Sequence, residues 1–248
     1  MATAHGEKSS MTLNDIKDYP LFVDQELESI QLLEQQGHAN TIYLVQSKRK
    51  KYLLRRFKIS INRQMEYRVQ LRAYAYKIGA KPLVLDRKKG LMISEFIEGV
   101  HQSKLTQRQL KQMAHLLKKL HKIKIRQKQN SFKNNFSFKN KKVKRAFILL
   151  SKEKKEYALG HNDLHPQNIL FTKRGIRLID WEYARNSDIY FDLVSIMIEY
   201  KLNRHECKIF LHNYFQGKSV NQKKIKAFTI IYKELWDLWF KKLAKGEL

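Results

Sequence analysis

A ten-residue stretch at positions 161–170, "HNDLHPQNIL", constrains the fold more than any other part of the chain. It combines histidines, asparagines, an aspartate and a proline. Asn, Asp and Pro favour turns and local hydrogen bonds over regular ladders. Apolar residues adjoin it on both sides, in "YALG" before the turn and in "NILF" at its end. We therefore predict a polar turn held between two apolar segments.

A hairpin joins this turn to a second acidic segment. The run "NILFTKRGIRLIDWEYA" is typical of two short strands with a glycine turn, and Asp180 follows the second strand. Asp163, Asn168 and Asp180 should then lie near each other on a rigid base. Carboxylate and amide oxygens suit Mg²⁺ better than Zn²⁺, and the chain has no Cys/His spacing for zinc. We predict Asn168 and Asp180 as metal ligands and Asp163 as the acceptor of a hydroxyl proton.

The pattern along the chain divides it into two parts. Up to about residue 97 we expect one helix at 13–35, two hairpins of strands, and a helix that ends at Gly79. From Thr106, a plausible N-cap, the chain is mostly helical, with further helices at about 141–156 and from 190 onward. We predict an α+β fold in which 1–12 form a flexible tail, 13–97 a first lobe and 98–248 a second, larger lobe.

Composition narrows the class of protein. The chain has 248 residues, 43% of them hydrophobic, which is enough for one core or two. Cys207 is its single cysteine, so an internal disulfide framework is excluded. No apolar run reaches the roughly 20 residues that span a bilayer, and "MATAHGEKSSM" lacks the apolar region of a signal peptide. We expect a cytoplasmic protein.

The charge is strongly positive, with 50 Lys and Arg against 23 Asp and Glu. Such a balance can indicate a nucleic-acid or anionic-membrane partner, or it can reflect composition alone, with lysines on solvated helix faces. The basic stretch 118–145 contains Phe132, Phe136 and Phe138, and aromatic rings among cations also occur in single-stranded nucleic-acid sites. Both interpretations remain open at this point.

The two acidic segments resemble the catalytic core of the choline/ethanolamine kinase and aminoglycoside phosphotransferase family, whose members are related to protein kinases. The protein-kinase loop H-R-D-x-x-x-x-N becomes His161-Asn162-Asp163 with Asn168 at the same offset, and D-F-G becomes Asp180-Trp181-Glu182. The "WEYA" continuation and a short activation segment without A-P-E favour small-molecule kinases. The resemblance implies a two-lobed, protein-kinase-like fold, ATP and Mg²⁺ as cofactors, and catalytic roles for Asp163, Asn168 and Asp180.

Further motifs follow in the family's order. "QQGHANTIYLVQ" resembles the hairpin that covers the phosphates, and "YLLRRF" the third-strand phosphate motif. "MISEFIEG" resembles the linker that meets adenine. The nucleotide-binding residues that this resemblance implies are Gly37, Asn40, Arg55 with its partner Glu66, and Glu95, Phe96 and Ile97.

The acceptor implied by the resemblance is a small alcohol, choline-like or thiamine-like, and cationic. The acceptor residues are predicted to be Asp163, Glu182, Glu199, Trp236 and Trp239. The tryptophans offer cation–π contacts, although their spacing also fits a buried helix face. The alternatives are an aminoglycoside or sugar phosphotransferase, an atypical basic protein kinase, and a kinase-like nucleic-acid module. The sequence leaves the acceptor and the oligomeric state undetermined.

Overall fold

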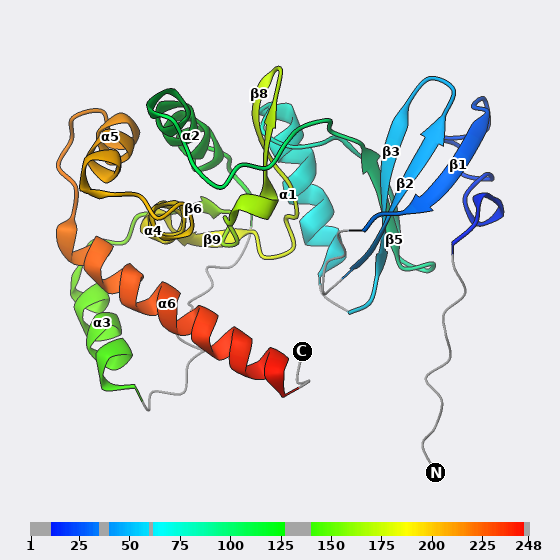
Figure 1. Cartoon of the computed structure of the whole chain (residues 1–248). Helices are drawn as coiled ribbons and strands as arrows, with labels where there is room; N and C mark the ends of the chain where they lie inside the picture. Colours follow the sequence, from blue (N-terminus) through cyan, green and yellow to red (C-terminus); the bar gives the residue numbers. More distant parts are fainter. Residues whose placement is uncertain (1–10, 35–39, 60–61, 127–139, 246–248) are drawn as a thin grey trace, which may run out of the picture. The chain divides into compact units, whose positions relative to one another are not determined.

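The computed structural model describes residues 11–34, 40–59, 62–126 and 140–245. The chain forms two compact units (Figure 1). Unit 1 comprises residues up to Tyr67 together with Lys81–Phe96, and unit 2 comprises Arg68–Ala80 and Ile97–Leu248. The predicted boundary after residue 97 stays a prediction. In the structure the long segment of unit 2 begins at Ile97, and unit 2 also includes Arg68–Ala80.

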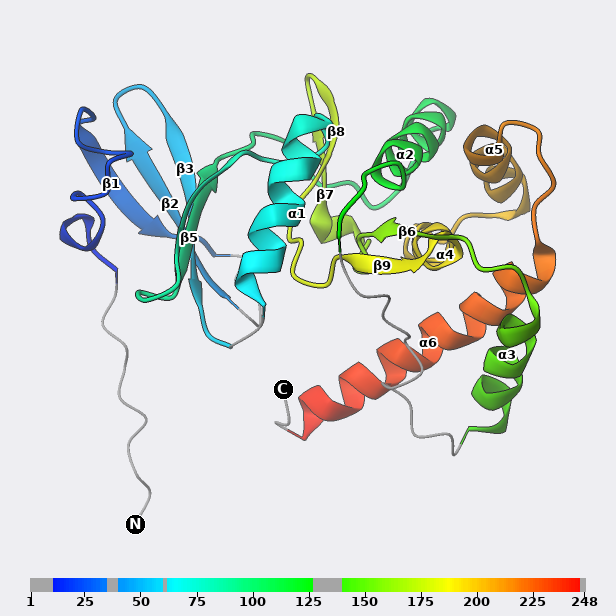
Figure 2. The same cartoon turned by 180° about the vertical axis from the view of Figure 1, so that it is seen from behind.

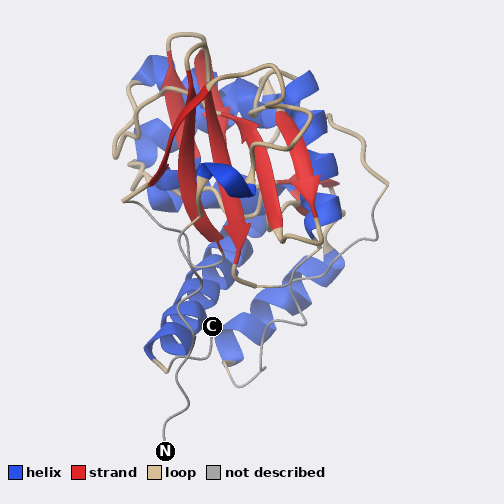
Figure 3. Cartoon of the chain, turned by 90° about the vertical axis from the view of Figure 1, so that its right-hand side faces the viewer, coloured by secondary structure: helices blue, strands red, loops and turns tan. Residues whose placement is uncertain are grey.

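Unit 1 is built on an antiparallel sheet, whose strands are red in Figure 3, with strand order β1-β2-β3-β5-β4. Its strands are β1 (Leu27–Leu32), β2 (Asn40–Ser47), β3 (Lys51–Phe57), β4 (Pro82–Asp86) and β5 (Leu91–Glu95). The predicted strands of the two hairpins are confirmed. Each pair uses a short turn, because antiparallel neighbours need only a few residues to reverse direction.

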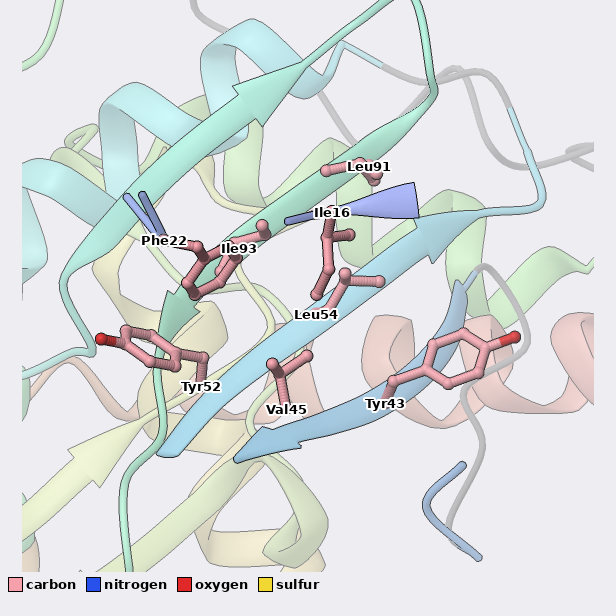
Figure 4. Packing of buried hydrophobic residues seen from close by; sticks show 8 residues of the cluster. All are labelled: Ile16, Phe22, Tyr43, Val45, Tyr52, Leu54, Leu91 and Ile93. Carbon is pink, nitrogen blue, oxygen red and sulfur yellow. The ribbon is translucent and has the colours of Figure 1, made fainter. Parts of the chain in front are cut away.

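One face of this sheet carries the core of unit 1 (Figure 4). The buried side chains that form it are Ile16, Phe22, Tyr43, Val45, Tyr52, Leu54, Leu91 and Ile93. Tyr43 and Val45, like Tyr52 and Leu54, are two positions apart on one strand, so both members of each pair point to the same face. Figure 4 shows these side chains from neighbouring strands gathered together with Ile16 and Phe22.

The predicted helix at 13–35 is wrong. The chain makes only a short 3₁₀ helix at Leu13–Asp15, followed by turns and then by β1. Pro20 cannot donate a backbone hydrogen bond to a continuing helix. The residues after it satisfy their backbone groups on β2 instead, with Ile30 opposite Val45. Met11 packs against the core, so it belongs to unit 1 rather than to a tail.

The helices of unit 2 follow the predicted order (Figure 1). They are the later part of α1 (Arg63–Ala75), α2 (Gln107–Leu120), α3 (Lys141–Lys152), α4 (Ile189–Glu199), α5 (Arg204–Phe215) and α6 (Gln222–Ala244). Thr106 caps α2 by accepting a hydrogen bond from the Gln109 amide, as predicted. The predicted apolar face of α2 is buried and consists of Leu110, Met113, Leu117 and Leu120. The helix predicted to reach about residue 156 ends at Lys152, since Glu153 is already extended.

Two small strand pairs of unit 2 carry the polar turn. β6 (Tyr157–Gly160) pairs with β9 (Arg185–Asp188), and β7 (Ile169–Thr172) pairs with β8 (Gly175–Leu178) as the predicted hairpin. The pattern missed β9, because "RNSD" has no β-branched or aromatic residue. Seen from behind in Figure 2, α6 lies beside α3, and it also contacts α4. None of the described helices is both long and apolar enough to cross a membrane.

Candidate active site

The polar turn, which we call the catalytic turn (His161–Asn168), is fixed by a carboxylate from a distant helix. Asp192 in the first turn of α4 is fully buried, and its two oxygens accept the backbone N–H groups of His161 at 2.8 Å and Asn162 at 2.9 Å. Nε2 of His121 lies 3.1 Å from Asp192 Oδ2, and its Nδ1 lies 2.6 Å from the Tyr214 hydroxyl. A buried carboxylate with several such partners is stable only in this arrangement, so the turn is rigidly held.

Asn162 shows why the turn needs its particular residues. Its φ is +65°, a left-handed conformation that Asn tolerates better than most residues. Its Nδ2 donates to the Gly160 and Tyr183 carbonyls, and its Oδ1 accepts from Ser187 Oγ at 2.7 Å. A Cβ on Gly160 would lie only 2.4 Å from Ser187 Oγ. This position therefore requires glycine for close packing.

His161 contributes to the base of the turn. It is fully buried, its Nε2 lies 3.0 Å from the Ile179 carbonyl oxygen, and its ring lies 4.7 Å from that of Trp181. Burial lowers the pKa of His161 to about 4, against the opposing effect of Asp192. The imidazole is therefore neutral at physiological pH, and His161 shapes the turn through its packing and hydrogen bonding.

The partly buried Asp163 and the buried Asn168 contact each other within the turn. Asn168 Nδ2 donates to Asp163 Oδ2 at 2.8 Å and to the Asp163 carbonyl at 3.0 Å. Burial, with a further contribution from the charge of Asp180, raises the pKa of Asp163 to about 7, although the Asn168 hydrogen bond opposes this shift. Raised carboxyl pKa values at concave polar sites are typical of groups that take up protons.

Asp180 reaches the same region through the hairpin. The Ile179 N–H donates to the Asn168 carbonyl at 3.0 Å, which ties the end of the hairpin to the catalytic turn. Asp180 itself has φ +62°. Its charge acts on Asp163, so the structure brings the three predicted catalytic residues together within unit 2.

The donor set fits Mg²⁺. Since the Asn168 amide nitrogen is directed to Asp163, its Oδ1 remains the group that can act as a ligand beside the Asp180 carboxylate. Within the described ranges no three His, Cys, Asp or Glu side chains form a metal cluster. Mg²⁺ in nucleotide sites is usually bound by one or two protein carboxylates together with substrate phosphates and waters.

Acidic and aromatic side chains extend from the catalytic turn toward α6. Tyr232 donates to Glu199 Oε1 at 2.9 Å, the Trp236 ring lies 6.3 Å from Tyr232, and the His165 ring lies 6.4 Å from Trp236. His165 Nε2 lies 3.8 Å from Asp163 Oδ2. We call Glu199, Tyr232, Trp236 and His165 the acid–aromatic cluster. α4 and α6 supply three of its members because these helices pack against each other.

Two further predicted acceptor residues are Trp239, which adjoins this cluster, and Glu182, which interacts with Tyr183. Trp239 packs against Trp236, with ring centroids 5.6 Å apart, and against Phe240. Glu182 acts on its neighbour Tyr183. Burial first, and then the charges of Glu182 and Asp163, raise the pKa of Tyr183 to about 12. The negative charge of Glu182 thus belongs to the same local field as that of Asp163.

Unit 1 holds the predicted phosphate-binding arginine in a buried ion cluster. Arg55 on β3 lies with its Nη2 2.7 Å from Glu66 Oε1, so the predicted Arg55–Glu66 pair exists. Arg63 completes the cluster, with Nη1 2.8 Å from Glu66 Oε2. All three side chains are nearly inaccessible to solvent. Arg63 was not among the predicted residues, although its position three residues before Glu66 on α1 was a usable signal.

The other predicted nucleotide-binding residues lie partly outside the described residues. Gly37 lies outside the described residues, as do Phe132, Phe136 and Phe138 of the basic stretch. Asn40 is buried at the start of β2, opposite Phe57. The Glu95 and Phe96 N–H groups donate to the Lys81 and Lys51 carbonyls. These two N–H groups are therefore already used within the sheet. An adenine contact at this linker stays a prediction, and it would have to use the backbone carbonyl groups or Ile97.

Comparisons with known proteins agree with this geometry. The model of a family described as "Phosphotransferase enzyme family" matches residues 141–228. Protein LicA of Haemophilus influenzae is 26% identical over 214 residues, which cover 73% of this chain and 79% of the relative. A LicA homolog of Metamycoplasma hominis is 31% identical over 173 residues, which cover 63% of this chain and 68% of the relative. The crystal structure of choline kinase LicA from Streptococcus pneumoniae shares the fold, with a TM-score of 0.74 at 24% identity over 90% of this chain and 88% of that one.

Proposed function

Because the chain belongs to the choline/ethanolamine kinase and aminoglycoside phosphotransferase family, we propose that it transfers the γ-phosphoryl group of ATP to the hydroxyl of a small cationic alcohol, choline-like or thiamine-like. The observation that carries this proposal is the position of Asp163. Its carboxyl group lies between the amide of Asn168 and the acid–aromatic cluster. An acceptor whose hydroxyl lies next to Asp163 would thus have its cationic end near Glu199 and the aromatic rings of α6.

Asp163 aligns the acceptor hydroxyl and accepts its proton. Its raised pKa brings its proton affinity close to the operating pH, which is the condition for an effective general base. Asn168 holds the Asp163 carboxylate by a hydrogen bond, and Asp192 holds the backbone beneath it. In a loose phosphoryl-transfer transition state, such positioning and electrostatic stabilisation supply most of the rate enhancement.

Unit 2 supplies the proposed metal ligands, Asn168 and Asp180, and unit 1 supplies the proposed phosphate contact, Arg55. Asn168 and Asp180 would hold Mg²⁺, which would neutralise charge on the phosphate oxygens when bound. Arg55 orients the α- and β-phosphates, because a planar guanidinium matches phosphate oxygens in a bidentate contact. Glu66 keeps the Arg55 side chain in a fixed rotamer.

The acid–aromatic cluster supports a cationic acceptor in spite of the positive chain. Asp163, Asp180, Glu182 and Glu199 create a local negative field. Exposed lysines farther away than about a Debye length, ~8 Å at physiological salt, are screened and act weakly on it. A desolvated cation over an aromatic face gains roughly 2 kcal/mol. Trp236 and Tyr232 offer such faces next to the Glu199 carboxylate.

The test is a screen of ATP consumption with the full chain over choline, ethanolamine, thiamine, aminoglycosides, neutral sugars and a generic protein substrate. We expect turnover with a cationic alcohol, and a requirement for Mg²⁺ or Mn²⁺. Asp180→Ala should abolish metal-dependent ATP binding. Turnover with only neutral sugars, aminoglycosides or a protein would refute the choline-like or thiamine-like acceptor. Full activity in excess EDTA would refute the metal role of Asp180 and Asn168.

A further inference from the structure

Unit 1 contains a cavity of about 670 Å³ that the proposed reaction does not use. Its walls come from the end of β3, the start of α1 and the turn between β4 and β5. Three lining side chains are cations, namely Lys58, Arg63 and Arg87, and two are amides, Asn62 and Gln64. None of the described lining residues is acidic. We call this space the cationic cavity.

The turn that carries Arg87 is fastened to the sheet. The Phe57 N–H donates to the Gly90 carbonyl at 2.8 Å, which joins the end of β3 to the β4–β5 turn. Gly90 has φ +67°, a conformation that glycine adopts without strain. Within the turn, the Lys89 N–H donates to Asp86 Oδ1 at 2.8 Å. These bonds hold the backbone that carries Arg87, so the wall of the cavity does not have to form around a ligand.

Arg63 links the cationic cavity to the buried ion cluster. Its guanidinium lies 4.1 Å from the centroid of the Phe57 ring, and its Nη1 contacts Glu66. Only 6% of Arg63 is exposed. Glu66 divides its two oxygens between Arg63 and Arg55, at 2.8 and 2.7 Å. A change in the bonding of Arg63 therefore changes the share of the Glu66 charge that acts on Arg55.

We propose that the cationic cavity binds a small anion bearing a phosphate group, and that this binding weakens the binding of nucleotide phosphates at Arg55. Guanidinium and ammonium groups with neighbouring amides are the donors that phosphate oxygens prefer. An anion in the cavity competes with Glu66 for Arg63. Glu66 then holds Arg55 more strongly and leaves less of its positive charge for a nucleotide. The coupling rests on the proposed role of Arg55, whereas the anion site does not.

The anion site is tested by calorimetric titration of the full chain with inorganic phosphate, at constant ionic strength set with chloride. The double variant Lys58→Ala/Arg87→Ala should lose about tenfold or more in phosphate affinity, since it removes two of the three cations. Lys88→Ala, an exposed lysine of the same turn that does not line the cavity, is the matched control and should bind phosphate like the wild type. Equal phosphate affinity in the double variant and the wild type would overturn the site, as would an equal loss in the control.

The coupling is tested by measuring the Kd for ADP with and without saturating phosphate. Wild-type protein should bind ADP about fivefold more weakly with phosphate, at the lower end of usual allosteric couplings. The double variant should bind ADP normally and show no response to phosphate. The same response in the double variant means that phosphate competes at the nucleotide site, which overturns the coupling. Absence of any ADP binding by the wild type would contradict the proposed function instead, while the phosphate titration still decides the anion site.

Discussion

Two carboxylates of this chain, the buried Glu66 in unit 1 and the partly buried Asp163 in unit 2, have opposite surroundings. Glu66 lies between Arg55 and Arg63, so two cations from the protein itself neutralise it. Asp163 accepts hydrogen bonds from the neutral Asn168 amide, and the charges that act on it come from acids, above all Asp180. A carboxylate paired with arginines stabilises the fold. A carboxylate next to other acids creates a negative field, which favours the binding of a positively charged ligand or metal ion.

This difference assigns separate tasks to the two units. The Arg55–Glu66–Arg63 cluster fixes the position of a positive group, which suits contact with phosphates. The region around Asp163 combines the proposed proton acceptor, the proposed metal ligands Asn168 and Asp180, and a negative field, which suits the proposed Mg²⁺ and cationic acceptor. Each prediction below alters one side of the comparison and leaves the other unchanged.

The largest effect is expected for Asp163→Asn on turnover. The amide keeps the size of the side chain but cannot accept the hydroxyl proton, so kcat should fall by about 10²–10⁴-fold. ADP binding should remain nearly normal, because Asp163 is not among the proposed nucleotide-binding residues. Single-turnover kinetics and an ADP titration measure the two quantities. Turnover close to that of the wild type would remove Asp163 from the mechanism.

On the other side of the comparison, Glu66→Gln should destabilise the protein. It leaves Arg55 and Arg63 buried close together without their shared counter-charge, and breaking such a buried pair costs about 3–5 kcal/mol of unfolding free energy. Urea unfolding at neutral pH measures this loss. The exposed strand residue Glu28 supplies the control Glu28→Gln, which should change stability by less than about 1 kcal/mol. An equal stability for both variants would contradict our description of the cluster.

Asp163→Asn should also change how stability depends on pH. Because the folded-state pKa of about 7 lies above the usual 3.8, the native protein binds more protons than the unfolded chain between these values, and wild-type stability falls as pH rises through this window. The variant lacks this loss. Its stability relative to the wild type should therefore be greater at pH 8 than at pH 4.5, by about 3 kcal/mol at 1.36 kcal/mol per pKa unit, because part of the window between 3.8 and about 7 lies below pH 4.5. Thermal unfolding at both pH values measures it, and a constant difference would show that the Asp163 pKa is not raised.

The smallest effect concerns the acid–aromatic cluster. Glu199→Gln and Trp236→Leu should each raise the KM for the cationic acceptor by about 30-fold, which corresponds to a cation contact of roughly 2 kcal/mol. The KM for ATP should hardly change. Asp237→Asn, an exposed acid of the same helix, is the matched control and should leave both values unaltered. A parallel rise of both KM values in the cluster variants would indicate distorted packing of α6 rather than a lost acceptor contact.

Local patterns allowed much of the fold to be predicted. The hairpins, the buried face of α2 with its Thr106 cap, and the glycine turn of β7–β8 follow from spacing within a few residues. The structure of the segment before β2 could not be predicted from local spacing. Its strand β1 forms only by pairing with β2, which follows it in the chain. β9 was missed for the same reason, since its polar residues acquire strand structure only opposite β6.

The sequence by itself determined which chemical groups this protein places together near residue 163. The five-residue offset from Asp163 to Asn168 and the short hairpin to Asp180 leave them little freedom to separate. Only the tertiary structure decided the state of those groups. Three features depend on neighbours from other elements. They are the hydrogen bonds from the catalytic turn to Asp192, the raised pKa of Asp163, and the ion pairs of Glu66 with two arginines. The physical reason is that hydrogen bonds within a turn follow local spacing, whereas desolvation and Coulomb interactions sum over every group that the fold brings near.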